Sequence, residues 1–90
     1  MKLGQTVMTR AVGNAVVENY LYYQFVFDSL ERYKNHDWGD LPHEDKRMND
    51  SAVKNNDDRI VARYNSEYGD IYIITEYDRS YTTILFTNEY

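Results

Sequence analysis

The chain contains no cysteine, which excludes a disulfide framework, a zinc site built on thiolates and a cysteine nucleophile. One proline and four glycines are too few for a disordered chain, so the composition predicts an ordered protein. No apolar run approaches the roughly 18 residues of a membrane span, and the first residues lack the apolar stretch of a signal peptide. We therefore expect a cytoplasmic protein with no membrane partner.

The length of the chain limits the size of its core. Ninety residues leave no room for a second independent core, so we expect a single domain over residues 1–90. Small domains without disulfides or metal often gain stability from a partner chain. Self-association is therefore one hypothesis for this chain.

Acidic residues are concentrated in the second part of the sequence. Residues 1–34 carry four basic and three acidic groups, whereas residues 35–90 carry six and twelve, for a net charge of −5. Direct binding of nucleic acid is disfavoured, because it depends on Lys and Arg displacing counterions from phosphates. An acidic surface instead suits a protein partner with a basic patch, or serves solubility alone.

Ten tyrosines are the other unusual feature of the composition. Tyrosine has a large rigid body and a polar tip, and little entropy is lost when it is fixed, so it suits binding surfaces. The same properties suit small cores and exposed strand faces. Composition alone does not distinguish these uses.

The first part of the sequence predicts helices after a short extended segment. Residues 3–8 favour a brief edge strand or extended arm, and either Thr9 or Asn14 is suited to cap the first helix. From 15 to 34 the apolar residues recur at helical spacing, and a break at 19–22 would divide this stretch into two helices. Either version leaves more aromatic surface than one core needs. This excess indicates a dimer or partner surface, and the alternative is that the rings belong to an ordinary core.

The second part changes from helical to alternating periodicity. A connector at 35–40 precedes a helix from 41 to about 54. Pro42 fits the first helical turn, and Glu44 and Asp45 are favoured near the positive end of the helix dipole. Three strands are predicted at 59–65, 70–76 and 81–87, joined by short turns into an antiparallel meander. The predicted fold class is α+β, with the N-terminal helices packed on a three-stranded antiparallel sheet.

Several strings in residues 30–90 resemble a known family. The string D-W-G-D-L begins at Asp37, and I-T-E-x-D-R-S-x-T-T spans Ile74 to Thr83. Both are similar to strings shared by small, uncharacterised bacterial proteins that are often carried by plasmids and phages. The resemblance implies a mobile-element context in a bacterial host cell, and it carries over no catalytic residue. The tyrosine-rich N-terminal third does not share it.

No residue pattern predicts catalysis or a cofactor. The cluster of His and acidic residues at 36–45 lacks the spacing of a zinc site, and no nucleophile elbow or phosphate-binding loop is present. We expect Trp38 to be buried with its indole N–H bonded, and Arg79 to pair with Asp78 or another carboxylate. The chain is therefore expected not to be an enzyme and to need neither cofactor nor metal.

The leading functional hypothesis is a small acidic protein-binding module from a mobile element. Its specific form is an inhibitor of a nucleic-acid-handling host defence protein, of the anti-CRISPR or anti-restriction type. One alternative is a homodimeric structural or regulatory module, and another is a small polar-ligand binder at the Asp78–Arg79 hairpin end. The residues expected to form a partner-binding acidic strip are Asp37, Asp40, Glu44, Asp45, Glu67, Tyr68, Asp70, Tyr72 and Tyr77.

Overall fold

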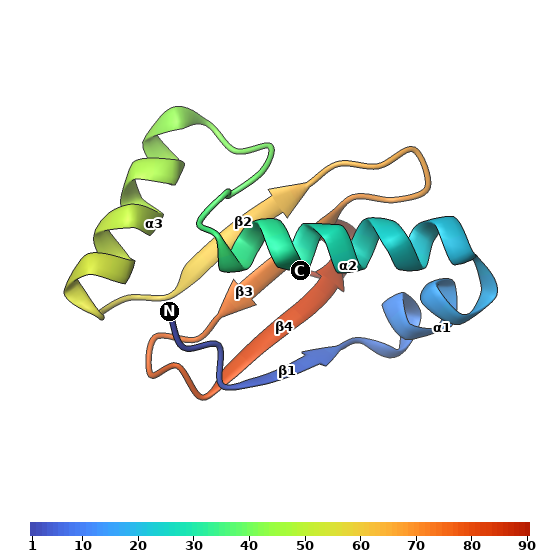
Figure 1. The fold of residues 1–90 in the computed structure, drawn as a ribbon, viewed down its shortest axis with the longest axis horizontal. Coiled ribbons are helices and arrows are strands. Elements are labelled where there is room, and N and C mark those ends of the chain that lie inside the picture. Colours follow the sequence, from blue (N-terminus) through green and yellow to red (C-terminus); the bar gives the residue numbers. More distant parts are fainter.

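The computed structural model describes all residues from 1 to 90 as three helices and one four-stranded sheet (Figure 1). The elements follow the order β1 (Gln5–Met8), α1 (Arg10–Glu18), α2 (Tyr20–Lys34), α3 (His43–Asn55), β2 (Ile60–Tyr64), β3 (Ile71–Thr75), β4 (Tyr81–Phe86) and a 3₁₀ turn at Thr87–Glu89. The α+β class predicted from the sequence is therefore present.

The sheet has a fourth strand, which lies within the segment 3–8 that favoured a brief edge strand or an extended arm. Its order is β1-β4-β3-β2, and the pairs β2–β3 and β3–β4 are antiparallel. β1 pairs with β4 in parallel, from Gln5 opposite Tyr81 to Met8 opposite Ile84. The expected three-stranded meander is therefore corrected to a four-stranded mixed sheet, with β1 as one of its two edges.

A glycine allows the first residues to reach β4. Gly4 has a φ of +63°, and a Cβ atom there would collide with the carbonyl oxygens of Arg79 and Ser80. Only glycine tolerates both this conformation and so close an approach of two backbones. The amide of Gln5 then donates to the carbonyl of Ser80, which starts the parallel pairing.

One asparagine separates the first two helices. Asn19 ends α1, because its amide donates to the carbonyl of Ala15, and its side chain accepts from the amides of Leu21 and Tyr22 at the start of α2. Thr9 caps α1 through Val12, whereas Asn14 lies inside that helix. The sequence-predicted break at 19–22 is therefore located at Asn19.

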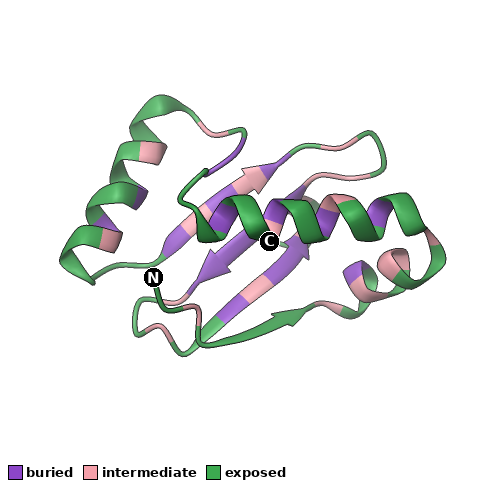
Figure 2. Ribbon diagram, viewed as in Figure 1, coloured by how far each residue is buried: buried purple, intermediate pink, exposed green.

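The main core lies between α2 and the sheet (Figure 2). Buried residues of α2, with Val12 of α1 and Trp38 of the connector, pack against alternate residues of β2, β3 and β4. Tyr33 is fully buried, and its hydroxyl lies 2.6 Å from Thr75 Oγ1, which lies 2.8 Å from Thr82 Oγ1. Because Thr82 donates to the carbonyl of Leu3, the hydroxyls form one directed chain from α2 to the N-terminal arm.

The connector and α3 are fixed to the core by polar contacts. Trp38 is 2% exposed, and its indole N–H donates to Asp50 of α3 at 2.8 Å, in agreement with the expectation from the sequence. Asn49 of α3 both donates to and accepts from the backbone of Val61. Through these two contacts, α3 is held beside β2 at the sheet edge opposite β1.

Candidate functional site

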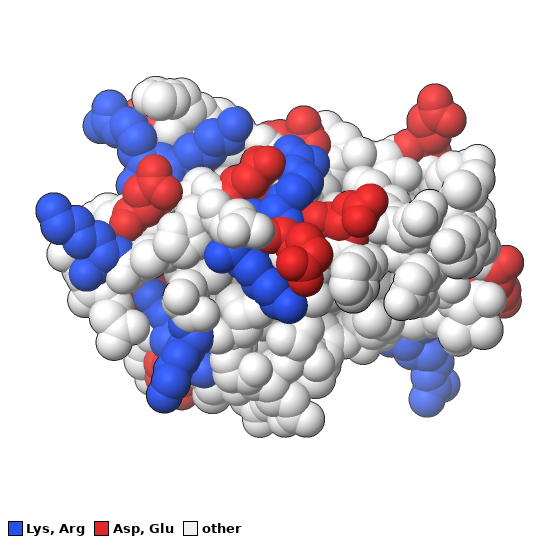
Figure 3. Space-filling view, in the orientation of Figure 1, with Lys and Arg blue, Asp and Glu red and all other residues white.

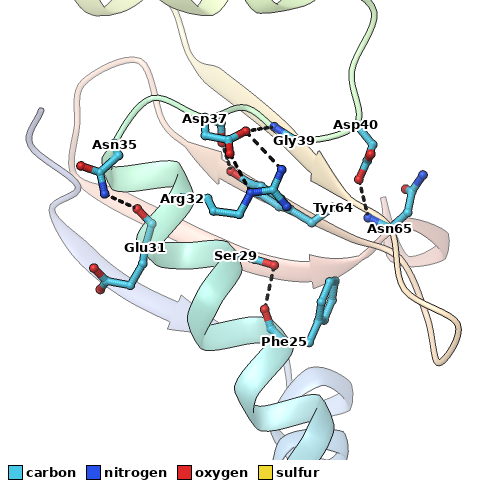
Figure 4. Close-up of polar contacts among 10 residues, drawn as sticks. All are labelled: Phe25, Ser29, Glu31, Arg32, Asn35, Asp37, Gly39, Asp40, Tyr64 and Asn65. Atoms are coloured by element: carbon cyan, nitrogen blue, oxygen red, sulfur yellow. Dashed lines mark hydrogen bonds and ion pairs between the residues drawn. The ribbon is translucent and has the colours of Figure 1, made fainter.

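Most of the aspartates predicted to face a partner are bonded within the chain. Asp37 accepts from Arg32 Nε at 2.8 Å and from the amide of Gly39, and Asp40 accepts from the amide of Asn65 (Figure 4). Asp70 likewise accepts from Arg63 and from the amide of Ser66, both at 2.9 Å. These carboxylates therefore organise the connector and the first hairpin turn.

The pKa values of these groups reflect the same contacts. The hydrogen bond from Arg32 lowers the pKa of Asp37, and the amide of Gly39 adds to this effect. The pKa of Asp70 is lowered first by the backbone amide of Ser66 and then by Arg63. Both groups are stabilised in their charged form by neighbours, rather than being unpaired charges that await a partner.

The predicted acidic strip is not continuous. In an antiparallel meander, consecutive turns lie at opposite ends of the sheet, so Glu67 and Tyr68 are separated from Tyr77 by the length of β3 (Figure 1). Glu44, Asp45 and Glu67 are exposed, and none forms an ion pair. On the face seen in Figure 3, acidic and basic side chains alternate over α3 and α2 instead of forming a single-sign stripe.

Arg79 fixes the second hairpin turn, but through backbone carbonyls and not through the carboxylate that the sequence predicted. Arg79 pairs with no carboxylate: its guanidinium donates to five carbonyl oxygens, which belong to Ala52, Asp57, Asp58, Glu76 and Tyr77. Asp78 instead accepts from the amide and hydroxyl of Ser80, which lower its pKa. Arg79 thus joins the end of α3 to the β3–β4 turn, and both Nη atoms are already occupied.

Two of the predicted residues meet on the sheet face opposite α2. Asp45 and Tyr72 line a shallow pocket of about 280 Å³ together with Leu41, Met48, Asn49, Arg59, Val61 and Tyr90. Tyr90 closes one side, because its ring packs edge-on against Tyr72 and beneath the guanidinium of Arg59. The C-terminal residues therefore cover part of this face.

An uncovered apolar surface lies at the other edge of the sheet. All four residues of β1 are exposed, and Figure 2 shows this strand exposed along its length while β3 and β4 are largely buried. Between β1, the end of β4 and the first two helices lies a hollow that we call the β1 groove. Its lining residues are Thr6, Met8, Val16, Tyr23, Val26, Phe27, Leu30 and Ile84.

Two exposed aromatic rings of α2, Tyr23 and Phe27, form one wall of the β1 groove, and Tyr20 continues the row beyond it. Tyr20, Tyr23 and Phe27 are 71%, 46% and 51% exposed, and successive rings stack at centroid distances of 6.3 and 6.2 Å. The hollow encloses only about 100 Å³. That is below the 300–1,000 Å³ usual for small-molecule pockets, so the groove suits a few side chains of a docked segment and not a metabolite.

The backbone of β1 is unpaired on its outer side. Gln5 and Thr9 donate their amides to β4, so by alternation the N–H and C=O groups of Thr6 and Met8 point away from the sheet. No further strand lies beyond β1. The free edge and the β1 groove together form the surface best suited to bind another chain.

The sequence indicated only part of this site. The excess of aromatic residues in 20–27 left open a dimer or partner surface and an ordinary core, and the contribution of β1 was missed. The available signal was the uncharged string Gln5–Met8 after Gly4, which becomes informative only once β1 is known to pair with β4. Tyr68 and Tyr77 are exposed, as a binding role requires, but both lie outside the β1 groove.

Comparisons with known proteins identify no relative. No family model, no curated protein and no solved structure matches the chain. No three His, Asp or Glu side chains gather where they could hold a metal ion. None of the helices is long and apolar enough to cross a membrane.

Proposed function

We propose that this protein acts by binding another protein through the free edge of β1 and the adjoining β1 groove. The observation that carries the proposal is the coincidence of an unpaired strand edge with a row of exposed aromatic rings. Exposed strand edges are usually blunted by charge, proline or a covering element, because they pair readily with other chains. The strand Gln5–Met8 carries neither charge nor proline.

The aromatic rings would contribute most of the binding free energy. Large aromatic side chains dominate the energetics of protein interfaces, and fixing them costs little entropy. Phe27 and Tyr23 already pack against each other, so they are preorganised before a partner arrives. Truncating such anchors typically weakens binding by more than 1 kcal/mol each.

The test is affinity capture from cells that carry the gene, using matched tyrosine and phenylalanine variants. Phe27→Asp in the β1 groove is compared with Tyr77→Asp, a substitution of a more exposed aromatic in a distant turn. We expect the identified partner to be retained by the wild type and Tyr77→Asp but lost with Phe27→Asp. Equal retention by both variants would contradict the proposal.

A second candidate function follows from the acidic groups that remain unpaired. Glu44, Asp45 and Glu67 are exposed and free of ion pairs in a chain of net charge −5. They support the narrower hypothesis of an inhibitor that engages the basic surface of a nucleic-acid-handling defence protein. Long-range attraction of this kind speeds association and weakens with salt.

Charge reversal tests the second candidate separately. Converting Glu44, Asp45 and Glu67 to Lys leaves the fold intact, because exposed unpaired charges contribute little to stability. Asp70 is excluded from the set, since it holds Arg63 and the amide of Ser66. Salt-sensitive capture that the triple variant loses would support an inhibitor of this type, and capture indifferent to both salt and reversal would reject it.

A further inference from the structure

We infer that the shallow pocket lined by Asp45, Arg59 and Tyr90, which we call the α3 pocket, binds a small apolar zwitterion of the kind of a free α-amino acid with an apolar side chain. The α3 pocket shares no lining residue with the β1 groove, so the inference goes beyond the proposed function. It follows from three observations: apolar walls, two opposite charges without partners, and a wall that is anchored in advance.

One side of α3 and the sheet face opposite α2 form the walls of the α3 pocket. Asp45, Met48 and Asn49 share one side of the helix, and Val61 and Tyr72 belong to β2 and β3. Asn49 joins the two walls, because its side-chain amide exchanges hydrogen bonds with the backbone of Val61. Most of the lining is apolar, and the volume of about 280 Å³ lies near the lower end of the range usual for small-molecule sites. The pocket therefore suits a small ligand with an apolar body.

Two side chains of opposite charge line the α3 pocket without being paired. Asp45 and Arg59 are both exposed, and neither forms an ion pair with the other or with any other residue. The residues three and four positions before and after Asp45, which are its neighbours along that side of α3, are all uncharged. The carboxylate of Asp45 is thus free to accept from a ligand.

The guanidinium of Arg59 is also free to bind a ligand. The carboxylate of Asp58 accepts from the backbone amide of Arg59 instead, and Glu76, which continues the antiparallel register opposite Arg59, forms no ion pair. The guanidinium lies over the ring of Tyr90 and donates to its hydroxyl. Only this one of its five N–H groups has an acceptor within the chain, so a pair of donors remains for both oxygens of a carboxylate.

The two free charges specify a ligand that carries both signs. A ligand carboxylate fits the remaining donors of Arg59, and a ligand ammonium fits the carboxylate of Asp45. A ligand with a single charge would gain one of these contacts and meet a like charge at the other, which is unfavourable. An apolar α-amino acid carries an ammonium, a carboxylate and an apolar side chain on one small molecule.

The wall formed by Tyr90 is held in place before a ligand binds. Its ring packs edge-on against Tyr72. The preceding residue, Glu89, accepts hydrogen bonds from the hydroxyl of Thr9 and the amide of Phe86, which anchors the end of the chain beside the sheet. Binding to a wall that is already ordered loses less conformational entropy than binding to one that must first be ordered.

Phenylalanine and its two singly blocked forms test the inference by NMR titration of the isotopically labelled chain. N-acetylphenylalanine lacks the positive charge, and phenylalaninamide lacks the negative charge at about pH 6, where α-amino groups are protonated. We expect phenylalanine to bind about fivefold or more tightly than either blocked form. The amide signals of Val61 and Tyr72 and the methyl signal of Met48 should shift, while the signals of β1 should not.

Variants identify which residue recognises which charge. With Asp45→Asn, phenylalanine should lose its advantage over N-acetylphenylalanine, and with Arg59→Gln it should lose its advantage over phenylalaninamide. Glu44→Gln and Arg47→Gln are the matched controls, because both residues are exposed on α3, form no ion pair and lie outside the α3 pocket. Exposed unpaired charges contribute little to stability, so all four variants should fold. The controls should keep the full preference for phenylalanine.

Four results would overturn the inference: no binding of phenylalanine, a blocked form that binds as tightly as phenylalanine, a preference that survives both Asp45→Asn and Arg59→Gln, or shifts that leave Val61 and Tyr72 unaffected. The proposed function is judged separately, because Phe27 lies outside the α3 pocket. Capture of a protein partner that depends on Phe27 would stand even if phenylalanine did not bind.

Discussion

At the scale of single residues, buried polar groups determine how the layers fit together. Tyr33, Thr75 and Thr82 pass hydrogen bonds from α2 through β3 and β4 to the carbonyl of Leu3, and no buried side-chain polar atom is left without a partner. A buried network of this kind stabilises only when every member is satisfied. Removing its central hydroxyl should therefore lower the free energy of unfolding by more than the loss of one ordinary hydrogen bond would.

Thr75→Val is the substitution that tests the hydroxyl chain. It preserves shape but leaves Tyr33 and Thr82 without their shared partner, so the free energy of unfolding should fall by about 1–3 kcal/mol. Thr83→Val is the matched control, because Thr83 is only half-buried and makes no side-chain hydrogen bond. Urea denaturation measures both. Equal effects of the two substitutions would mean that the hydrogen-bonded hydroxyls make no specific contribution to stability.

Substitution of Trp38 tests how the connector is fixed to the core. Trp38→Ala should lower the free energy of unfolding by roughly 3–5 kcal/mol, because it empties a site packed against Tyr33 and removes the donor to Asp50. Trp38→Phe should recover part of this loss by refilling the volume. A melting temperature unchanged by Trp38→Ala would contradict the assigned role.

Alkaline pH should destabilise the protein through its buried tyrosines. Burial raises the pKa of Tyr22 and Tyr33 from 10.0 to about 12 and raises that of Tyr64 as well. Between pH 10 and about 12 the unfolded chain loses these protons while the folded chain keeps them. The free energy of unfolding should therefore fall as pH rises through this range, because deprotonation favours the unfolded chain.

Denaturation midpoints recorded at several values from about pH 8 to 11 measure this dependence. Tyr33→Phe should show a shallower decline than the wild type, since one group no longer titrates in the unfolded chain. Identical slopes for the two proteins would show that Tyr33 is not held protonated by the fold.

At the scale of elements, local patterns predicted the strands well and their partners less well. The three predicted antiparallel strands differ from β2, β3 and β4 by one residue at most ends, because alternation marks each buried face directly. The parallel pairing of β1 depends on a contact with a strand far along the chain, which local periodicity does not encode. The expected Arg79–Asp78 pair failed for the same reason, since the carbonyls that Arg79 binds at the end of α3 are distant in sequence.

The junction of α1 and α2 gives a prediction for an element boundary. Asn19→Ala removes the cap that serves Leu21 and Tyr22, so the free energy of unfolding should fall by about 1 kcal/mol. Asn14→Ala is the matched control, because it places a better helix former inside α1. Thermal denaturation followed by circular dichroism should therefore show a lower melting temperature only for Asn19→Ala. A melting temperature lowered equally by both substitutions, or by Asn14→Ala alone, would contradict the capping role of Asn19.

At the scale of the whole molecule, one edge of the sheet is covered and the other is open. β2 is covered by the connector and α3 through Gly39, Trp38 and Asn49, whereas nothing lies beyond β1. The acidic residues that sequence reasoning assigned to a partner are partly used to build the covered side. The uncharged strand and its aromatic neighbours remain on the open side, which is why we propose the binding function there.

The most direct test of that assignment is photo-crosslinking in cells that carry the gene. A photoreactive phenylalanine analogue placed at position 27 is compared with the same analogue at position 77, where Tyr77 is 70% exposed but distant from β1. Isotopic labelling of the chain separates self-crosslinks from those to another protein. We predict a crosslink to a foreign protein from position 27 and none from position 77. Crosslinks absent from position 27, or equally abundant from both positions, would contradict the account.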